Sequence, residues 1–244
     1  MNNYSEKFEK MKIAGNLAAR TLDMLTDNIK VGISTDYIDK LGYEFIRDNN
    51  GHSAPLFYRG FKKSLCTSLN HVVCHGIPSD RILDEGDIIN VDVTCILNGY
   101  YGDSCRMYPI GTISKEAARL VKTTKECLDE SIKALSPFCP LNRVGDCIQE
   151  IADKAGYSVV KLFGGHGIGN DFHEEPFVFH NKLKEKQMIC APGMVFTIEP
   201  MINVGKFDVK VLNDGWTAVT KDKSLSAQFE HTIGITEDSY EIFT

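Results

Sequence analysis

The chain has 244 residues, of which 43% are hydrophobic and 25% are charged, and its formal net charge is −6 at pH 7. This composition is typical of a globular protein, and the length suffices for one large hydrophobic core. The acidic balance argues against a general nucleic-acid-binding surface, which needs a basic face, and no stretch approaches the ~20 apolar residues of a membrane span. We therefore expect one domain over residues 1–244, cytoplasmic, with neither a membrane nor a specific nucleic acid as partner.

The eight cysteines form no C-x-x-C pair, and the polar residues 1–12 that precede them contain no apolar secretory segment. Reduced thiols in the cytosol are therefore expected rather than disulfides. The cysteines are Cys66, Cys74, Cys95, Cys105, Cys127, Cys139, Cys147 and Cys190.

Two helices are predicted at the start of the chain. Apolar residues recur at three- and four-residue steps from Tyr4 to about Asp27, as on one face of a helix. A second helix is predicted to begin after an N-cap at Ser34 or Thr35 and to end at the Asn-Gly sequence at 50–51.

A β-hairpin follows. Apolar and polar residues alternate over 88–97, and Asn98-Gly99 is typical of a type I′ turn into a second strand over 100–108. This turn pairs Leu97 with Tyr100, so that the register of the whole hairpin is predicted.

That register places Asp92 opposite Cys105 and diagonal to Asp103, on one face of the sheet. Two carboxylates at this spacing can hold a metal ion or a metal pair, although two solvated aspartates on an exposed face would show the same pattern. The register also puts Arg106 on the apolar face, which requires a bulge or an open sheet edge.

The second half repeats the order of helix, helix and strands. Ser114 is predicted to cap a helix that continues through Leu135, and a shorter helix is predicted from about Val144 to Ala155. The repeated order suggests two related halves within one unit. Strands are predicted over 194–202, 209–212, 216–220 and 227–236, with a turn at 213–215.

Glu199 and Glu230 lie inside apolar predicted strands. A buried carboxylate is costly unless it pairs with a cation, becomes neutral or binds a metal, although an edge-strand glutamate with a lysine partner would fit the same pattern. His166 lies in the glycine-rich stretch GGHGIG at 164–169, where backbone can approach a ligand closely. The chain contains neither a phosphate-binding G-x-x-x-x-G-K-[ST] loop nor an H-E-x-x-H zinc motif.

Two aspartates, two glutamates and one histidine form an oxygen-rich donor set. Four carboxylates carry −4, which two divalent ions would balance. Such donors suit manganese, iron, cobalt or zinc, and a two-metal site gives a hydroxide nucleophile at neutral pH.

Seven blocks in this order resemble the motif series of type I methionine aminopeptidases. The blocks are LNHVVCHGIP at 69–78, NVDVT at 90–94, GD at 102–103, GHGIG at 165–169, FHEEP at 172–176, TIEP at 197–200 and QFEHT at 228–232. The resemblance covers nearly the whole chain. It implies an α/β (α+β) pita-bread fold, with two pseudo-symmetric halves and a curved antiparallel sheet covered by helices.

The resemblance also implies a set of site residues. Asp103 and Glu230 would bridge two metal ions, and Glu199 would also shuttle a proton. His75 and His173 would bind the substrate and stabilise the charge on the scissile carbonyl oxygen. The implied metal ligands are Asp92, Asp103, His166, Glu199 and Glu230.

A pocket for the methionine side chain is implied as well, and aromatic rings with sulfur suit a thioether. For Phe61 and Cys66, plain core packing is an equally good interpretation. The implied pocket residues are Tyr58, Phe61, Cys66, His75, Phe172, His173 and Trp216. The chain departs from the usual family residues at Pro55, Phe61 and His71, and Arg59 adds a charge at the rim; we expect these departures to change substrate range rather than the reaction.

The resemblance implies removal of the initiator methionine from nascent polypeptides, with a small second residue preferred. The expected partners are nascent peptide N-termini, any ribosome contact being local and transient, and the expected state is a monomer. Two alternatives are a non-catalytic pita-bread protein that binds RNA or protein, and an X-Pro-type aminopeptidase. Prolidases carry a sizeable extra N-terminal domain, and type II enzymes carry an insertion where only 30 residues separate Glu199 from Glu230 here.

Overall fold

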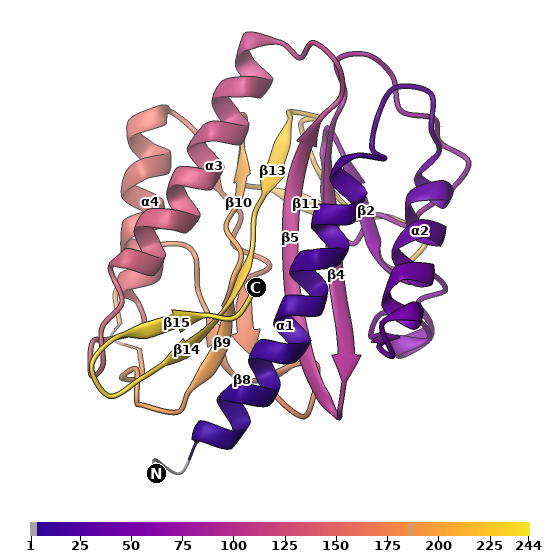
Figure 1. The fold of residues 1–244 in the computed structure, drawn as a ribbon. Coiled ribbons are helices and arrows are strands. Elements are labelled where there is room, and N and C mark those ends of the chain that lie inside the picture. Colours follow the sequence, from indigo (N-terminus) through magenta and orange to yellow (C-terminus); the bar gives the residue numbers. More distant parts are fainter. Residues whose placement is uncertain (1–3, 186) are drawn as a thin grey trace.

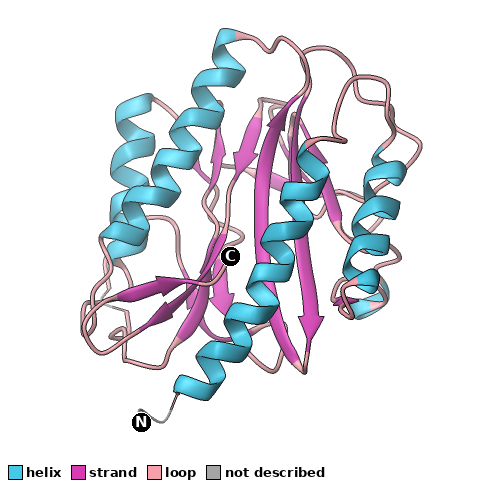
Figure 2. Ribbon diagram, viewed as in Figure 1, coloured by secondary structure: helices cyan, strands magenta, loops and turns pink. Residues whose placement is uncertain are grey.

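The structure, a computed structural model, describes residues 4–185 and 187–244. Its helices lie on one side of the molecule and its strands lie behind them (Figures 1 and 2). Helix α1 crosses in front of β4 (Ile88–Leu97) and β5 (Tyr100–Pro109), and α3 lies beside β10 (Met201–Asn203) and β13 (Ser226–Gln228), which it contacts (Figure 1). The helices are α1 Ser5–Thr26, α2 Thr35–Asp48, α3 Lys115–Lys133, α4 Arg143–Ala155 and the short 3-10 helix η1 Tyr58–Gly60.

Capping residues mark the starts of α2 and α3, as predicted, and the end of α4. The Ser34 hydroxyl accepts a hydrogen bond from the backbone N–H of Tyr37 at the start of α2, and Ser114 caps α3 in the same way. Helix α4 ends at Gly156, whose φ of 73° is the left-handed conformation that glycine adopts readily. No helix in the described ranges is long and apolar enough to cross a membrane.

The first half contains the predicted hairpin with the predicted register. Strand β4 (Ile88–Leu97) pairs with β5 (Tyr100–Pro109), so that Leu97 faces Tyr100 and Asp92 faces Cys105. The opposite edge of β4 pairs with β1 (His52–Ser53) and β2 (Cys66–Leu69). The alternating side chains of β4 therefore point either to α1 and α2 or to the second half of the chain.

Arg106 lies on the helix side of the sheet without a bulge, because the β4–β5 register is continuous. Its guanidinium contacts the Asp23 carboxylate at 2.7 Å, at the edge that β5 presents to α1. Of the two explanations that the sequence left open, the open edge is the correct one.

The structure has three further sheets in its described residues. All of their strands except β3 come from the second half of the chain. The five-stranded sheet has the order β15-β14-β9-β7-β8, and the two three-stranded sheets have the orders β13-β10-β6 and β11-β12-β3. Their strands are β3 Val72–Cys74, β6 Ser158–Val159, β7 Gly165–Gly167, β8 Glu174–Val178, β9 Val195–Ile198, β10 Met201–Asn203, β11 Val209–Val211, β12 Ala218–Thr220, β13 Ser226–Gln228, β14 His231–Ile235 and β15 Tyr240–Ile242.

The predicted single strands over 194–202 and 227–236 are wrong, because each is divided. The first divides into β9 and β10 at Glu199-Pro200, and the second into β13 and β14 at Phe229-Glu230. Pro200 has no N–H for a sheet ladder. Since β9 pairs with β14 whereas β10 pairs with β13, both segments leave one sheet and enter another at their glutamate.

The strand predicted over 216–220 begins at Ala218 instead. The Asp214 carboxylate accepts hydrogen bonds from the backbone N–H groups of Trp216 and Thr217, each at 2.9 Å, and so extends the turn.

The two larger apolar clusters lie beneath the helices of the two expected halves, and the second of them also includes Ile88 and Met107 of the first half. One lies beneath α1 and α2 and includes Leu22, Ile38, Ile89, Val91 and Val93. The other lies beneath α3 and α4 and includes Leu120, Ile148, Ile198, Ile202 and Ile233. Strands β4 and β5 also meet the second half through hydrogen bonds. The Asn90 amide, on the face that carries Asp92, donates to the Gln228 carbonyl, and the Ser104 hydroxyl, on the opposite face, donates to the Glu230 carbonyl, each at 2.8 Å.

Candidate active site

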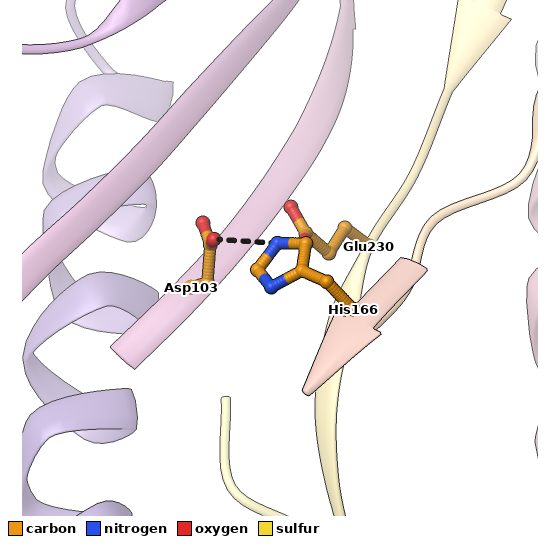
Figure 3. Close-up of side chains that lie close together, drawn as sticks. All are labelled: Asp103, His166 and Glu230. Carbon is orange, nitrogen blue, oxygen red and sulfur yellow. Dashed lines mark ion pairs between the residues drawn. The ribbon is translucent and has the colours of Figure 1, made fainter. Parts of the chain in front are cut away.

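Three side chains from distant parts of the chain converge at the contact between the halves (Figure 3). Asp103 lies on β5, His166 on β7, and Glu230 between β13 and β14. Each offers one ligand atom, and these atoms lie within 4.8 Å of one another. His166 Nε2 is 3.7 Å from Asp103 Oδ2 and also 3.7 Å from Glu199 Oε1. The predicted ligands thus meet in space, and Asp92 lines the same cavity.

The carboxylates are withdrawn from water. Asp103 and Glu230 are each 3% exposed, and Glu199 is 9% exposed. Burial raises the pKa of Asp92 to about 7. Burial, followed by the charge of Asp92, raises the pKa of Asp103 well above its usual range; burial and the charge of Asp103 do the same for the pKa values of Glu199 and Glu230.

The sequence left two other interpretations open: solvated aspartates on an exposed face, and edge-strand glutamates paired with lysine. Both are wrong for the buried acidic residues. The second half covers the face that carries Asp103, so this aspartate is not a solvated surface group. In residues 4–185 and 187–244, the acidic residues that form ion pairs with lysine or arginine do not include Glu199 or Glu230; the pairing of Glu199 within 4.0 Å is to His166.

Hydrogen bonds orient the carboxylates. The Thr94 hydroxyl donates to Asp103 Oδ1 at 2.7 Å. The Thr197 hydroxyl donates to Glu199 Oε1 at 2.8 Å, and the Gln228 amide donates to Glu199 Oε2 at 3.1 Å. Such partners fix ligand orientation around a metal.

Sequence analysis assigned no role to these three partners, nor to His180. Thr94 and Thr197 were detectable in principle, because Thr94 pairs with Asp103 across the hairpin and Thr197 precedes Glu199 by two strand positions. His180 accepts a hydrogen bond from the Glu199 backbone N–H at 3.2 Å through Nε2. No spacing rule links it to Glu199, since it follows the end of β8.

The donor set fits divalent metal ions. Four carboxylates and the neutral imidazole of His166, whose pKa burial lowers to about 4, are oxygen and nitrogen donors suited to hard or borderline cations. Their mutual repulsion in a buried place is offset when cations bind among them.

The cluster forms the floor of a cavity of about 990 Å³ that contains every predicted pocket residue. The Tyr58 hydroxyl is 3.0 Å from His173 Nδ1, and the Tyr58 ring centroid is 4.9 Å from that of Phe172. Phe61 and Trp216 meet edge to face at 5.1 Å. Phe61 and Cys66 are both buried and both line the cavity, so each is a core residue as well as a residue of the cavity wall.

The second half adds lining residues that sequence analysis missed, namely Leu162, Phe163, Gly164, Phe177 and Met201. Among the departures from the family, Pro55 and Arg59 line the cavity. His71 is absent from the described lining; it lies in the turn before β3, where its carbonyl accepts a hydrogen bond from the Thr220 N–H at 3.0 Å.

Comparison with known proteins gives the family. The profile of metallopeptidase family M24 matches residues 9–237. A methionine aminopeptidase of Rickettsia prowazekii is 49% identical over 99% of this chain and 94% of its own length. The chain belongs to the methionine aminopeptidases of family M24. The Escherichia coli K12 methionine aminopeptidase is 45% identical over 98% of this chain and 91% of its own length.

Solved structures of methionine aminopeptidases confirm the pita-bread fold. The crystal structure from Rickettsia prowazekii has a TM-score of 0.96 at 48% identity, and covers 98% of this chain and 97% of that chain. The structure from Thermotoga maritima has the same TM-score and coverage at 37% identity. A prolidase from Pyrococcus furiosus, at a TM-score of 0.77 and 19% identity, covers 98% of this chain and 64% of that chain and shares the fold alone. Membership in this family makes the chain a hydrolase of the aminopeptidase class.

Proposed function

We propose that this protein removes the initiator methionine from nascent polypeptides and prefers a small second residue. The observation that carries the proposal is one cavity that combines four carboxylates and an imidazole with aromatic side chains. The relatives described above bear the name of this activity.

We infer that Asp92, Asp103, His166, Glu199 and Glu230 hold two divalent ions, because two +2 charges balance four carboxylates. Manganese, iron, cobalt and zinc all match the donors. When bound, such ions lower the pKa of water and polarise a carbonyl group, which supplies a nucleophile at neutral pH.

Glu199 is proposed to carry the proton from the attacking water to the leaving amine. Thr197 and Gln228 each donate to one of its two oxygens, which holds the carboxylate plane fixed. A fixed carboxylate at the floor of the cavity can accept a proton and deliver it to the adjacent nitrogen.

His75 and His173 are proposed to contact the peptide around the cleaved bond. Burial lowers the pKa of His75 and lowers that of His173 to about 3, so both are neutral at pH 7. When the Tyr58 hydroxyl donates to His173 Nδ1, the proton on Nε2 is available to donate to the carbonyl oxygen where negative charge develops.

The pocket is proposed to select methionine through its shape and polarisability. Tyr58, Phe61, Phe172 and Trp216 offer ring faces and edges to the thioether, and Cys66 adds a sulfur atom. A large second residue would crowd the metal cluster, which is the proposed reason for the preference for a small one.

The experiment that tests this function uses chelator-treated protein and the peptide Met-Gly-Met, with manganese, cobalt, iron or zinc added back singly. Free methionine should appear when metal is restored, and Leu-Gly-Met should release little leucine. Bound metal measured by mass spectrometry should approach two ions per chain.

The alternatives give different results. A binding module would remain folded and cleave no peptide with any metal. An X-Pro-type aminopeptidase would cleave Ala-Pro-Ala faster than Met-Gly-Met.

A further inference from the structure

The mouth of the cavity carries a cation that the proposed reaction does not use. Arg59 is exposed and is the only lysine or arginine among the described residues that line the cavity. Arg47, Arg81 and Arg106 each pair with an aspartate, whereas Arg59 forms no ion pair with a carboxylate in residues 4–185 and 187–244. Its charge is therefore available to a ligand.

The backbone around Arg59 is held in an unusual conformation. Phe57 has a φ of 69°, Arg59 a φ of 46° and Gly60 a φ of 88°. Side-chain-bearing residues adopt this left-handed region at a cost, and such outliers cluster at functional sites. Two hydrogen bonds close the turn: the Phe57 N–H donates to the Phe61 carbonyl at 2.7 Å, and the Phe61 N–H donates to the Tyr58 carbonyl at 2.9 Å.

Tyr58 fixes the position of the Arg59 side chain relative to the reactive groups. The guanidinium carbon of Arg59 lies 5.2 Å from the centre of the Tyr58 ring, a favourable cation–π distance. The same tyrosine packs on Phe172 and lies within hydrogen-bond distance of His173. This contact favours a position of the cation at the edge of the site.

We propose that Arg59 is a specificity-determining residue that favours substrates with an acidic side chain shortly downstream of the cleaved bond. This inference rests on the proposed function. The first residue of a substrate occupies the interior of the cavity, so the remainder must leave through the mouth. An extended chain advances about 3.3 Å per residue, so the residues after the cleaved bond lead away from the carboxylates toward the exposed lining, where Arg59 lies.

The other charges of the rim are Glu174 and Glu175, which also line the cavity. Glu174 Oε1 accepts hydrogen bonds from the backbone N–H groups of Asn170 and Asp171, each at 3.0 Å, and is engaged in its own loop. Glu175 is exposed on β8, and it would favour a basic side chain instead. A preference for an acidic substrate side chain would therefore indicate that Arg59 faces the departing peptide, whereas a preference for a basic one would indicate Glu175.

The test uses the full-length, metal-loaded protein and C-terminally amidated peptides Met-Ala-Ser-X-Ser, with X as glutamate, glutamine or lysine. At low ionic strength, kcat/KM for the glutamate peptide should be about 3- to 10-fold higher than for the lysine peptide, as for an exposed charge pair. The difference should arise mainly from a lower KM. About 0.5 M salt should reduce the difference in kcat/KM between these two peptides, because salt screens the charges. R59Q should abolish the preference and R59E should reverse it, whereas R47Q, which removes an exposed charge from α2, should retain it.

Equal kcat/KM for the three peptides, or a glutamate preference that survives R59E, would overturn the inference. A lysine preference that disappears in E175Q would do the same. If R59E does not fold, comparison of R59K with R59Q tests the inference instead: R59K should retain the glutamate preference and R59Q should lose it. Absence of methionine release from every peptide would overturn the proposed function and this inference together, whereas release without discrimination overturns the inference alone.

Discussion

Thr94 faces Asp103 across the β4–β5 ladder, and its hydroxyl donates a 2.7 Å hydrogen bond to Asp103 Oδ1. Replacement of Thr94 by valine keeps the shape of the side chain and removes this bond. Because the partners of metal ligands hold them in place, T94V should weaken metal binding about 10- to 100-fold, measured by calorimetric titration of the metal-free protein.

Thr67→Val is the matched control for that change. Thr67 is buried on the neighbouring strand β2, and its hydroxyl has no hydrogen-bond partner among the described residues. T67V should bind metal like the wild type. Equal metal affinity in T94V and wild type would show that the hydroxyl does not position Asp103.

Replacement of His75 tests whether this residue contacts the substrate without binding metal. Its proposed role is toward the peptide, so His75→Ala should lower kcat about 100-fold or more, as for a lost hydrogen-bond donor at a developing charge. Metal content should stay near that of the wild type. Loss of metal from H75A would identify His75 as a ligand instead. Replacement of the exposed His52 by alanine serves as the control and should leave both quantities unchanged.

Above about pH 6.5, where the histidines of the unfolded chain have lost their protons, the metal-free protein should lose stability as the pH rises. Burial raises the pKa of Asp92 to about 7 in the folded state, above an unfolded value of about 3.9. A raised carboxyl pKa means that the folded state binds the proton more tightly, so its contribution to stability is present below the unfolded pKa and is lost as the pH passes through the folded pKa.

Calorimetry of chelated and metal-loaded protein from about pH 5 to about pH 8 checks this dependence. The increase in Tm on adding metal should grow with pH, because deprotonated ligands bind metal and metal stabilises the native state. A metal-dependent increase in Tm that is constant over this range would contradict it.

Gly165 allows β7 to approach β9. A Cβ at this position would overlap the carbonyl oxygen of Thr197, next to His166 and two residues before Glu199. Gly165→Ala should therefore lower both Tm and metal affinity, because the strands that carry these ligands must move apart. Gly156→Ala is the control: its φ of 73° makes alanine strained, but the space is open. G156A should cost about 1 kcal/mol of stability and leave metal affinity unchanged.

The sequence was most informative where structure is local. Asn98-Gly99 determines the hairpin turn, the turn determines the register, and the register brings Asp92 and Asp103 to one face. The strand breaks at Glu199 and Glu230 could not be predicted in this way, since they depend on an exchange of partners between strands about 30 residues apart. Pro200 was a signal for the first break, but alternation of apolar residues hid it.

The site itself was predicted through the resemblance of motif blocks rather than through spacing. The residues that support it, such as His180 and Met201, come from positions that approach the site only after the halves pack together. Tertiary packing, which no single segment encodes, decided their placement.

Asp92 and Asp103 belong to the first half, whereas His166, Glu199 and Glu230 belong to the second. Ions held by all five would cross-link the two halves at their contact, in addition to the smaller apolar clusters that already join them. Removal of the ions should then increase hydrogen exchange first along this contact, at β5 and at the segment between β13 and β14, while the centres of α1 and α3 remain protected.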